Sequence, residues 1–175
     1  ITWPHFFALA ALTLLLCGCS RNAMLAAAEK GDTKKVKRLL AKDPALADVC
    51  ETFAQGRSAL TLATVNGHAE VVAALLEAGA RTNYSHLMEL AARHGHIPVM
   101  EMLLKKGFSV HGDQFYSPLL SAAGGQPASV EFLLAHGADI NEQNNQRNGG
   151  CAALHYAALY GNPTMVTTLL AHGAN

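Results

Sequence analysis

The sequence predicts an all-α fold of five tandem helix-turn-helix units, and a recurring Leu-Leu pair is the main reason. The pairs follow one another at steps of 36, 28, 30 and 36 residues, a unit length that suits two short helices and excludes leucine-rich repeats. Gly stands three positions after four of the five pairs. The pairs are Leu39-Leu40, Leu75-Leu76, Leu103-Leu104, Leu133-Leu134 and Leu169-Leu170.

The residues around each pair indicate where the two helices of a unit begin and end. Apolar residues at helical spacing, such as Val71 and Leu75, form one buried stripe on the second helix. Small residues such as Ala91 and Ala92 let the first helices of neighbouring units approach closely. Left-handed glycines and helix-starting prolines are expected at Gly31, Gly67, Gly95 and Gly161, at Gly79, Gly107, Gly137 and Gly173, and at Pro98, Pro127 and Pro163.

Several spaced motifs recur together in these units. One unit reads Ala153-Leu154-His155-Tyr156-Ala157-Ala158, then Gly161-Asn162, then Leu169-Leu170 and Gly173-Ala174-Asn175. This order resembles the ankyrin repeat, with its Thr-Pro-Leu-His helix, its Gly-His turn, its Leu-Leu helix and its Gly-Ala exit. The resemblance covers roughly residues 23 to 175. It implies an ankyrin-repeat solenoid of five helix-turn-helix units with short β-hairpin fingers.

The resemblance also divides the chain. A leader over residues 1–19 precedes a repeat domain over residues 20–175. The five expected units span about residues 23–50, 51–83, 84–112, 113–142 and 143–175.

Three units depart from the pattern, and each departure predicts a local difference. The exposed side of the first unit is polar, as a terminal capping unit requires, and carries Glu29, Lys30, Lys34, Lys35, Lys37 and Arg38. Only six residues separate Gly79 from His86, against fourteen between Gly137 and Ala152, so a finger should be missing before the third unit. The fourth unit is one residue short around Gly124-Gly125, and we expect an irregular helix turn there.

The first twenty residues carry no charge and contain an apolar run that suits the hydrophobic part of a secretory signal. Leu16-Cys17-Gly18-Cys19 resembles the bacterial lipoprotein box, which implies lipidation of Cys19, although Cys17 is an unusual residue at its place. The alternatives are an ordinary signal cut nearby and a short uncleaved anchor. Because no Met precedes the run and no polar cap follows Asn175, we expect a fragment of a longer protein.

Composition narrows the function further. The 13 basic and 13 acidic residues balance, which argues against nucleic acid as a partner. Cys50 and Cys151 lie about three units apart and are expected as free thiols. The nine histidines show no zinc spacing, and no nucleophile or phosphate-binding motif is present. We therefore expect no metal, no cofactor and no enzymatic activity.

What remains is protein binding, and the resemblance implies a concave face made of the fingers and the exposed ends of the first helices. The residues carried over to that face are Gln55, Arg57, Asn66, Arg93, His94, Tyr116, Asn148, Leu159 and Tyr160. Each could equally be an ordinary solvated residue.

The sequence thus predicts a monomeric interaction module, exported and lipid-anchored in a bacterial cell envelope, where its concave face binds an envelope protein. An inhibitor or immunity-type protein that blocks an enzyme or toxin is the alternative, as is a secreted ankyrin effector.

Overall fold

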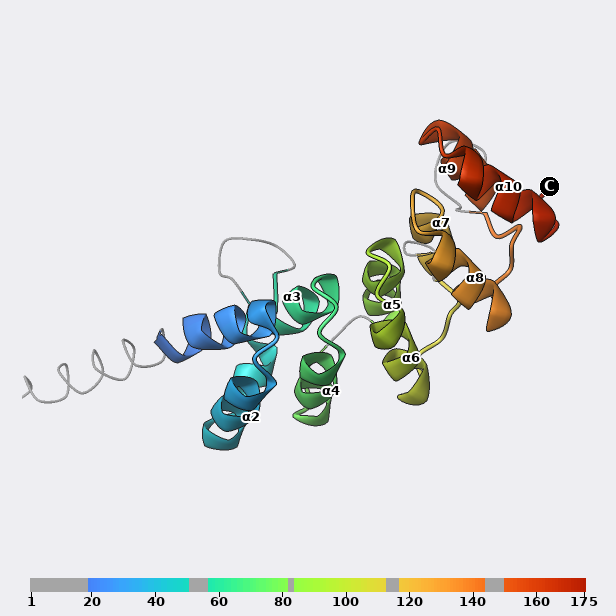
Figure 1. Ribbon diagram of the computed structural model, residues 1–175. Coiled ribbons are helices and arrows are strands. Elements are labelled where there is room, and N and C mark those ends of the chain that lie inside the picture. The colour runs from blue at the N-terminus through green and yellow to red at the C-terminus, as the bar shows by residue number, and fades with distance from the viewer. Residues whose placement is uncertain (1–18, 51–56, 82–83, 113–116, 144–149) are drawn as a thin grey trace, which may run out of the picture. The chain divides into compact units, whose positions relative to one another are not determined.

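The computed structural model describes residues 19–50, 57–81, 84–112, 117–143 and 150–175, and it is helical in successive pairs (Figure 1). Residues 19–30 are helical and precede the named elements. These are α2 (Thr33–Lys42), the 3-10 helix η1 (Pro44–Asp48), α3 (Ala59–Val65), α4 (Ala69–Glu77), α5 (Tyr84–Arg93), α6 (Ile97–Lys105), α7 (Pro118–Ala122), α8 (Pro127–Ala135), α9 (Ala153–Leu159) and α10 (Pro163–Ala171). The predicted all-α class is confirmed.

The expected β-hairpin fingers contain little regular β-structure in the described residues. The β-pairing found there is a single antiparallel bridge between Cys50 and Ser58. Before the third unit, α5 begins at Tyr84, so only residues 80–83 follow Gly79, and 82–83 lie outside the described residues. That short connection agrees with the missing finger.

Helix ends form where the sequence places its turn residues. Helices α6, α8 and α10 each have Pro in the first turn, and the Asn162 side chain caps α10 by accepting a hydrogen bond from the Met165 amide at 3.0 Å. Glycines with positive φ are found at all eight predicted positions: Gly31, Gly67, Gly79, Gly95, Gly107, Gly137, Gly161 and Gly173. The turn of the fourth unit differs, because neither Gly124 nor Gly125 has positive φ and α7 is only five residues long. The predicted irregularity is confirmed.

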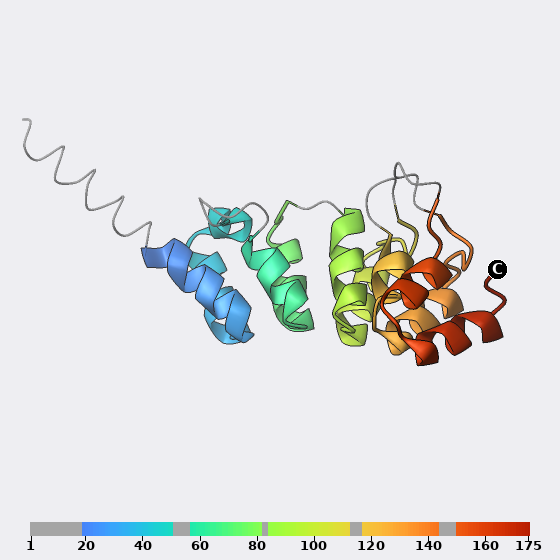
Figure 2. The same cartoon turned by 90° about the horizontal axis from the view of Figure 1, so that it is seen from above.

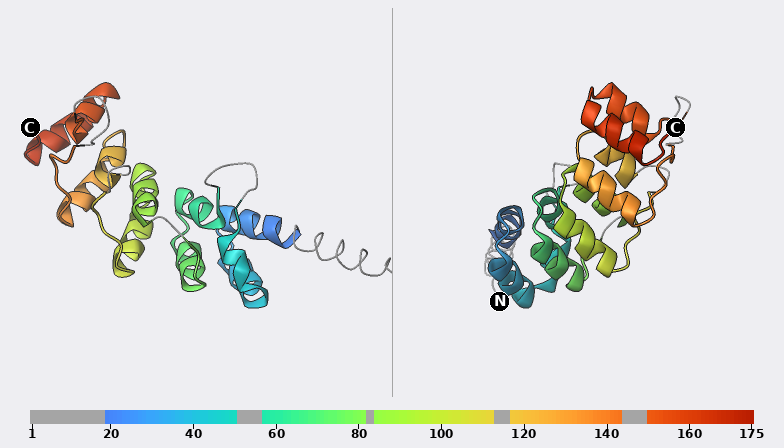
Figure 3. Two further views of the ribbon diagram at one scale, coloured as in Figure 1. Left: turned by 180° about the vertical axis from the view of Figure 1, so that it is seen from behind. Right: turned by 45° about the vertical axis from the view of Figure 1, so that its right-hand side comes forward.

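The chain divides into two compact units. The first holds residues 1–63 and 70–81, and the second holds residues 64–69 and 82–175. In the second unit α5 packs on α7 and α7 on α9, while α6, α8 and α10 follow one another as the second helices of their repeats (Figures 2 and 3). Each pair of helices contributes apolar side chains to the buried core.

Burial within the Leu-Leu pairs follows one rule with two exceptions. The first member is fully buried in four pairs, at Leu75, Leu103, Leu133 and Leu169. The second member is half-buried in the inner repeats, but Leu170 of the last pair is 53% exposed. In the first pair the order is reversed, with Leu40 at 8% and Leu39 half-buried. Because adjacent helical residues point in directions about 100° apart, the two members face different sides of the repeat.

The first and last repeats differ from the inner repeats in which side of the second helix is buried. In the first repeat a half-buried Lys35 stands where later repeats place fully buried Val71, Val99 and Met165. In the last repeat Val166 is only half-buried, although its counterparts Val36, Val72, Met100 and Val130 are fully buried. The polar Lys35 supports the interpretation of the first repeat as a cap.

Cysteine and membrane features complete the description. Cys19, Cys50 and Cys151 are free of disulfides, as expected for Cys50 and Cys151. No described helix has the length and apolar character needed to span a bilayer.

Candidate protein-interaction surface

The turns between paired helices touch one another throughout the second unit. The His96 ring donates from Nε2 to the Val65 carbonyl at 2.6 Å, since a carbonyl can only accept. A Cβ built on Gly67 would lie 2.6 Å from His96 Nδ1, and one on Gly95 would lie 2.6 Å from Gln126 Oε1. One on Gly124 would lie 3.3 Å from the Tyr160 ring. Residues 65–67, 93–96, 124–126 and 159–161 therefore form one continuous surface, here called the turn row.

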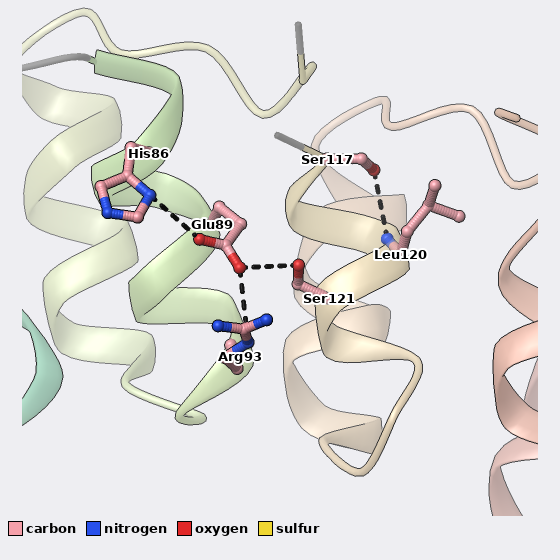
Figure 4. Close-up of polar contacts among 6 residues, drawn as sticks. All are labelled: His86, Glu89, Arg93, Ser117, Leu120 and Ser121. Atoms are coloured by element: carbon pink, nitrogen blue, oxygen red, sulfur yellow. Dashed lines mark hydrogen bonds and ion pairs between the residues drawn. The ribbon is translucent and has the colours of Figure 1, made fainter. Parts of the chain in front are cut away.

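A buried carboxylate positions Arg93 within the turn row. Glu89 is 3% exposed, and its Oε1 accepts a hydrogen bond from the Ser121 hydroxyl at 2.8 Å (Figure 4). His86 Nδ1 lies 3.3 Å from Glu89 Oε2, and Arg93 Nε lies 3.4 Å from Oε1 (Figure 4). The four side chains form a network between α5 and α7. It holds Arg93 at the end of α5 while leaving that side chain 58% exposed.

The network keeps Glu89 ionised. Burial by itself raises the pKa of the Glu89 carboxyl, but the close contact with His86, the hydrogen bond from Ser121 and the charge of Arg93 outweigh it. The net effect lowers the pKa of Glu89 below its ordinary 4.5. Glu89 is thus a carboxylate at neutral pH, and it offsets the positive charge of Arg93.

His94 adds a neutral aromatic side chain beside Arg93. The His94 and His96 rings are stacked, with centroids 6.0 Å apart and planes inclined by 13°. Burial lowers the pKa of His94, and the neighbouring His96 and Arg93 lower it further. Since the ordinary value is 6.5, His94 is neutral at pH 7.

Two large apolar side chains project at the end of α9. Leu159 is 77% exposed and Tyr160 is 64% exposed. With Leu170 they are the exposed large hydrophobic residues of the described chain. One edge of the Tyr160 ring lies close to Gly124, and most of the side chain stays accessible. An aromatic side chain held in this way suits a contact with another protein, because it has little conformational freedom to lose on binding.

The structure brings together five residues predicted from the sequence. Asn66, Arg93, His94, Leu159 and Tyr160 all lie in the turn row of the second unit and are exposed.

The other predicted residues lie elsewhere. Arg57 belongs to the first unit, where its Nη2 lies 3.8 Å from Glu29 Oε1. Gln55, Tyr116 and Asn148 lie outside the described residues. Cys19 is exposed on the helix of residues 19–30.

Sequence reasoning missed the Glu89 network. A signal was present, because Glu89 interrupts the apolar run of α5 at the position where the repeat pattern has His. A lone acidic residue in such a run is expected to have buried partners. Those partners come from the next repeat and could not be named without the fold. Within the described ranges no three His, Cys, Asp or Glu side chains are grouped to hold a metal ion.

Comparison with known proteins shows one family over nearly the whole chain. The family model for ankyrin repeats in three copies matches residues 7–86 and 88–175. The probable E3 ubiquitin-protein ligase XBOS32 of Oryza sativa subsp. japonica is 29% identical over 196 residues, covering 91% of this chain and 39% of that protein.

Two human proteins are similar at comparable levels. The mitochondrial disaggregase of Homo sapiens is 35% identical over 161 residues, covering 87% of this chain and 22% of that protein. Inversin of Homo sapiens is 31% identical over 175 residues, covering 93% of this chain and 16% of that protein. The chain therefore spans less than half the length of each of these relatives, and it aligns with only a part of each.

Proposed function

The chain belongs to the ankyrin-repeat family, and on that basis we propose that its turn row is the surface that holds a protein partner. Ankyrin repeats are interaction modules and are in general not catalytic. The partner would lie across the exposed ends of α5 and α9, where Arg93, His94, Leu159 and Tyr160 are accessible. This assignment concerns the second unit alone.

The exposure of Leu159 and Tyr160 is the observation that carries the proposal. Both side chains are more than three-fifths exposed. Covering a Leu or aromatic side chain contributes on the order of 1.5 to 3 kcal/mol, so the two could supply much of the affinity of a moderate complex. Arg93 adds a cation whose direction is already set by Glu89, which reduces the entropy lost on binding.

The test compares an apolar truncation inside the turn row with one outside it. The wild-type chain and its variants Leu159→Ala/Tyr160→Ala and Leu170→Ala are used to capture proteins from a bacterial envelope extract. Leu170 is the matched control, because it is also exposed but lies on α10, outside the turn row. A partner retained by wild type and by Leu170→Ala, and lost by the double variant, supports the proposal. Equal retention by all three contradicts it.

The place of action in this proposal is the cell envelope of a bacterium. The apolar leader and the Leu16-Cys17-Gly18-Cys19 motif support export, with Cys19 as the lipidated residue and the repeats monomeric outside the cytoplasm. Cys19 is also exposed, as an enzyme that attaches a lipid requires. Palmitate labelling of the expressed chain tests this step, and label that persists in Cys19→Ala would rule it out.

A further inference from the structure

The first unit carries a strongly basic helix that lies outside the turn row. Helix α2 has Lys34, Lys37, Arg38 and Lys42 exposed and Lys35 half-buried, while Val36 and Leu40 are buried. With about 100° between successive residues, the five basic residues fall within roughly 160° of the helix surface, and each lies about 100° or more from Val36. This set of five basic residues is here called the basic face.

No acidic residue of α2 neutralises the basic face, because the helix contains none. The carboxylates that flank α2 in the sequence contact backbone amides or an arginine of another segment. Asp32 Oδ1 accepts the Lys35 amide at 2.9 Å, and Asp43 Oδ1 accepts the Ala45 amide at 3.1 Å. Glu29 lies 3.8 Å from Arg57. In the described chain, the side chains of the basic face have no ion pairs of their own.

The chemistry of the basic face favours a diffuse anionic surface. Four of its five cations are Lys, which act as point charges rather than as planar forks for bidentate recognition. No Phe, Trp or Tyr occurs from Cys19 to Cys50, so bases of single-stranded nucleic acid would find no aromatic side chain to stack on. An array of lysines without aromatic residues matches the headgroups of anionic lipids well.

The position of the basic face in the chain supports the same choice. The first sixteen residues contain no Asp, Glu, Lys or Arg and are mostly apolar, and Lys34 follows Leu16 by eighteen positions. Stable attachment to a bilayer usually needs two signals, for example one hydrophobic element and one polybasic patch. The leader and the basic face would form such a pair in one stretch of chain.

We propose that the basic face of α2 docks on a bilayer rich in anionic phospholipid and adds a second membrane contact beside the N-terminal attachment. The docking is electrostatic and requires no lipid on Cys19. It involves no residue of the turn row, so the two surfaces can fail or succeed separately.

Vesicle flotation of the full chain tests the docking. Vesicles of phosphatidylcholine alone are compared with vesicles containing about one-third phosphatidylglycerol, and the measured quantity is the ratio of the two partition coefficients. The leader contributes to both coefficients and cancels in the ratio. Lys37→Gln/Arg38→Gln should lower this ratio about 30-fold, the size expected for two basic residues near an anionic surface. Raising the salt to about 0.5 M should lower the wild-type ratio in the same direction.

A matched variant excludes a general charge effect. Lys105→Gln/Lys106→Gln removes the same charge from two adjacent exposed residues in the second unit, and it should keep the wild-type ratio. A ratio near one for the wild type overturns the proposal, as does an equal loss in both double variants. So does a wild type that binds duplex DNA through Lys37 and Arg38 but shows no preference for phosphatidylglycerol. Circular dichroism of each variant verifies that the helices are intact.

Discussion

The two compact units are built from the same type of repeat and present opposite kinds of surface. Basic residues outnumber acidic ones in the first unit, and the reverse holds in the second, so a net charge of zero conceals an uneven distribution. The first unit presents the lysines of α2, whereas the second presents Leu159, Tyr160 and a pair of neutral or compensated side chains at Arg93 and His94. Similar rows of buried leucines therefore leave the outer positions free to serve different partners.

The largest effect should come from the buried row that the units share. Leu75→Ala in the first unit and Leu133→Ala in the second each remove a fully buried side chain, and each should lower the free energy of unfolding by about 2 to 5 kcal/mol. Leu134→Ala should cost much less, because Leu134 is only half-buried. Urea unfolding followed by circular dichroism measures all three. A marked difference between Leu75 and Leu133 would show that the two cores are not equivalent.

Exchanging the surface variants between assays sharpens the comparison. Lys37→Gln/Arg38→Gln should lose about 30-fold in preference for anionic vesicles yet retain the captured partner. Leu159→Ala/Tyr160→Ala should keep the wild-type preference for anionic vesicles and lose the captured partner. Partner capture that also depends on Lys37 and Arg38 would mean that the units act as one surface.

The Glu89 network should stabilise the second unit alone. Glu89→Gln keeps the acceptor for Ser121 but removes the charge, and it should cost about 1.5 kcal/mol at pH 7. Because the pKa of Glu89 is lowered on folding, this stabilisation is present above the ordinary value of 4.5 and is lost as the pH falls through the lowered value.

Urea unfolding at pH 7 and at pH 3 checks both statements. The difference between wild type and Glu89→Gln should narrow at the lower pH. Glu101→Gln, an exposed change of the same kind on α6, should stay within about 0.5 kcal/mol of wild type at pH 7. A difference that widens in acid would contradict the lowered pKa.

The smallest effects concern two helix turns, the irregular one of the fourth unit and the regular one of the fifth. Gly161 has a φ of 63°, so Gly161→Ala should cost about 1 kcal/mol. Gly125 has no positive φ, and a Cβ there would meet nothing within 4 Å, so Gly125→Ala should stabilise by about 0.5 kcal/mol. Thermal unfolding of the two variants compares them directly. Equal destabilisation would mean that both turns need glycine.

Much of the fold could be predicted because it depends on local rules. Leucine spacing, helix-ending glycines and helix-starting prolines are read along the chain, and the structure has them at the predicted places. The turn-row residues Arg93, His94, Leu159 and Tyr160 could also be named, since they keep a constant offset from the turn glycine.

Contacts between repeats could not be predicted in the same way. Ser121 reaches Glu89 from 32 positions along the chain, and Tyr160 covers Gly124 from the next repeat. Neither pairing has a periodic signal. The basic face was visible as a run of lysines, but its one-sidedness only became clear once Val36 and Leu40 were known to be buried.

By itself, the sequence determined the repeat, its helices and its turns, because each depends on residues within a few positions of one another. Only the tertiary structure decided which ionised and aromatic side chains meet, because stacking joins residues one repeat apart. Burial then sets their chemistry. Burial lowers the pKa of His94 and raises that of Glu89, and the partners of Glu89 reverse the second effect and keep it charged. Leu159 and Tyr160 stay exposed at the surface.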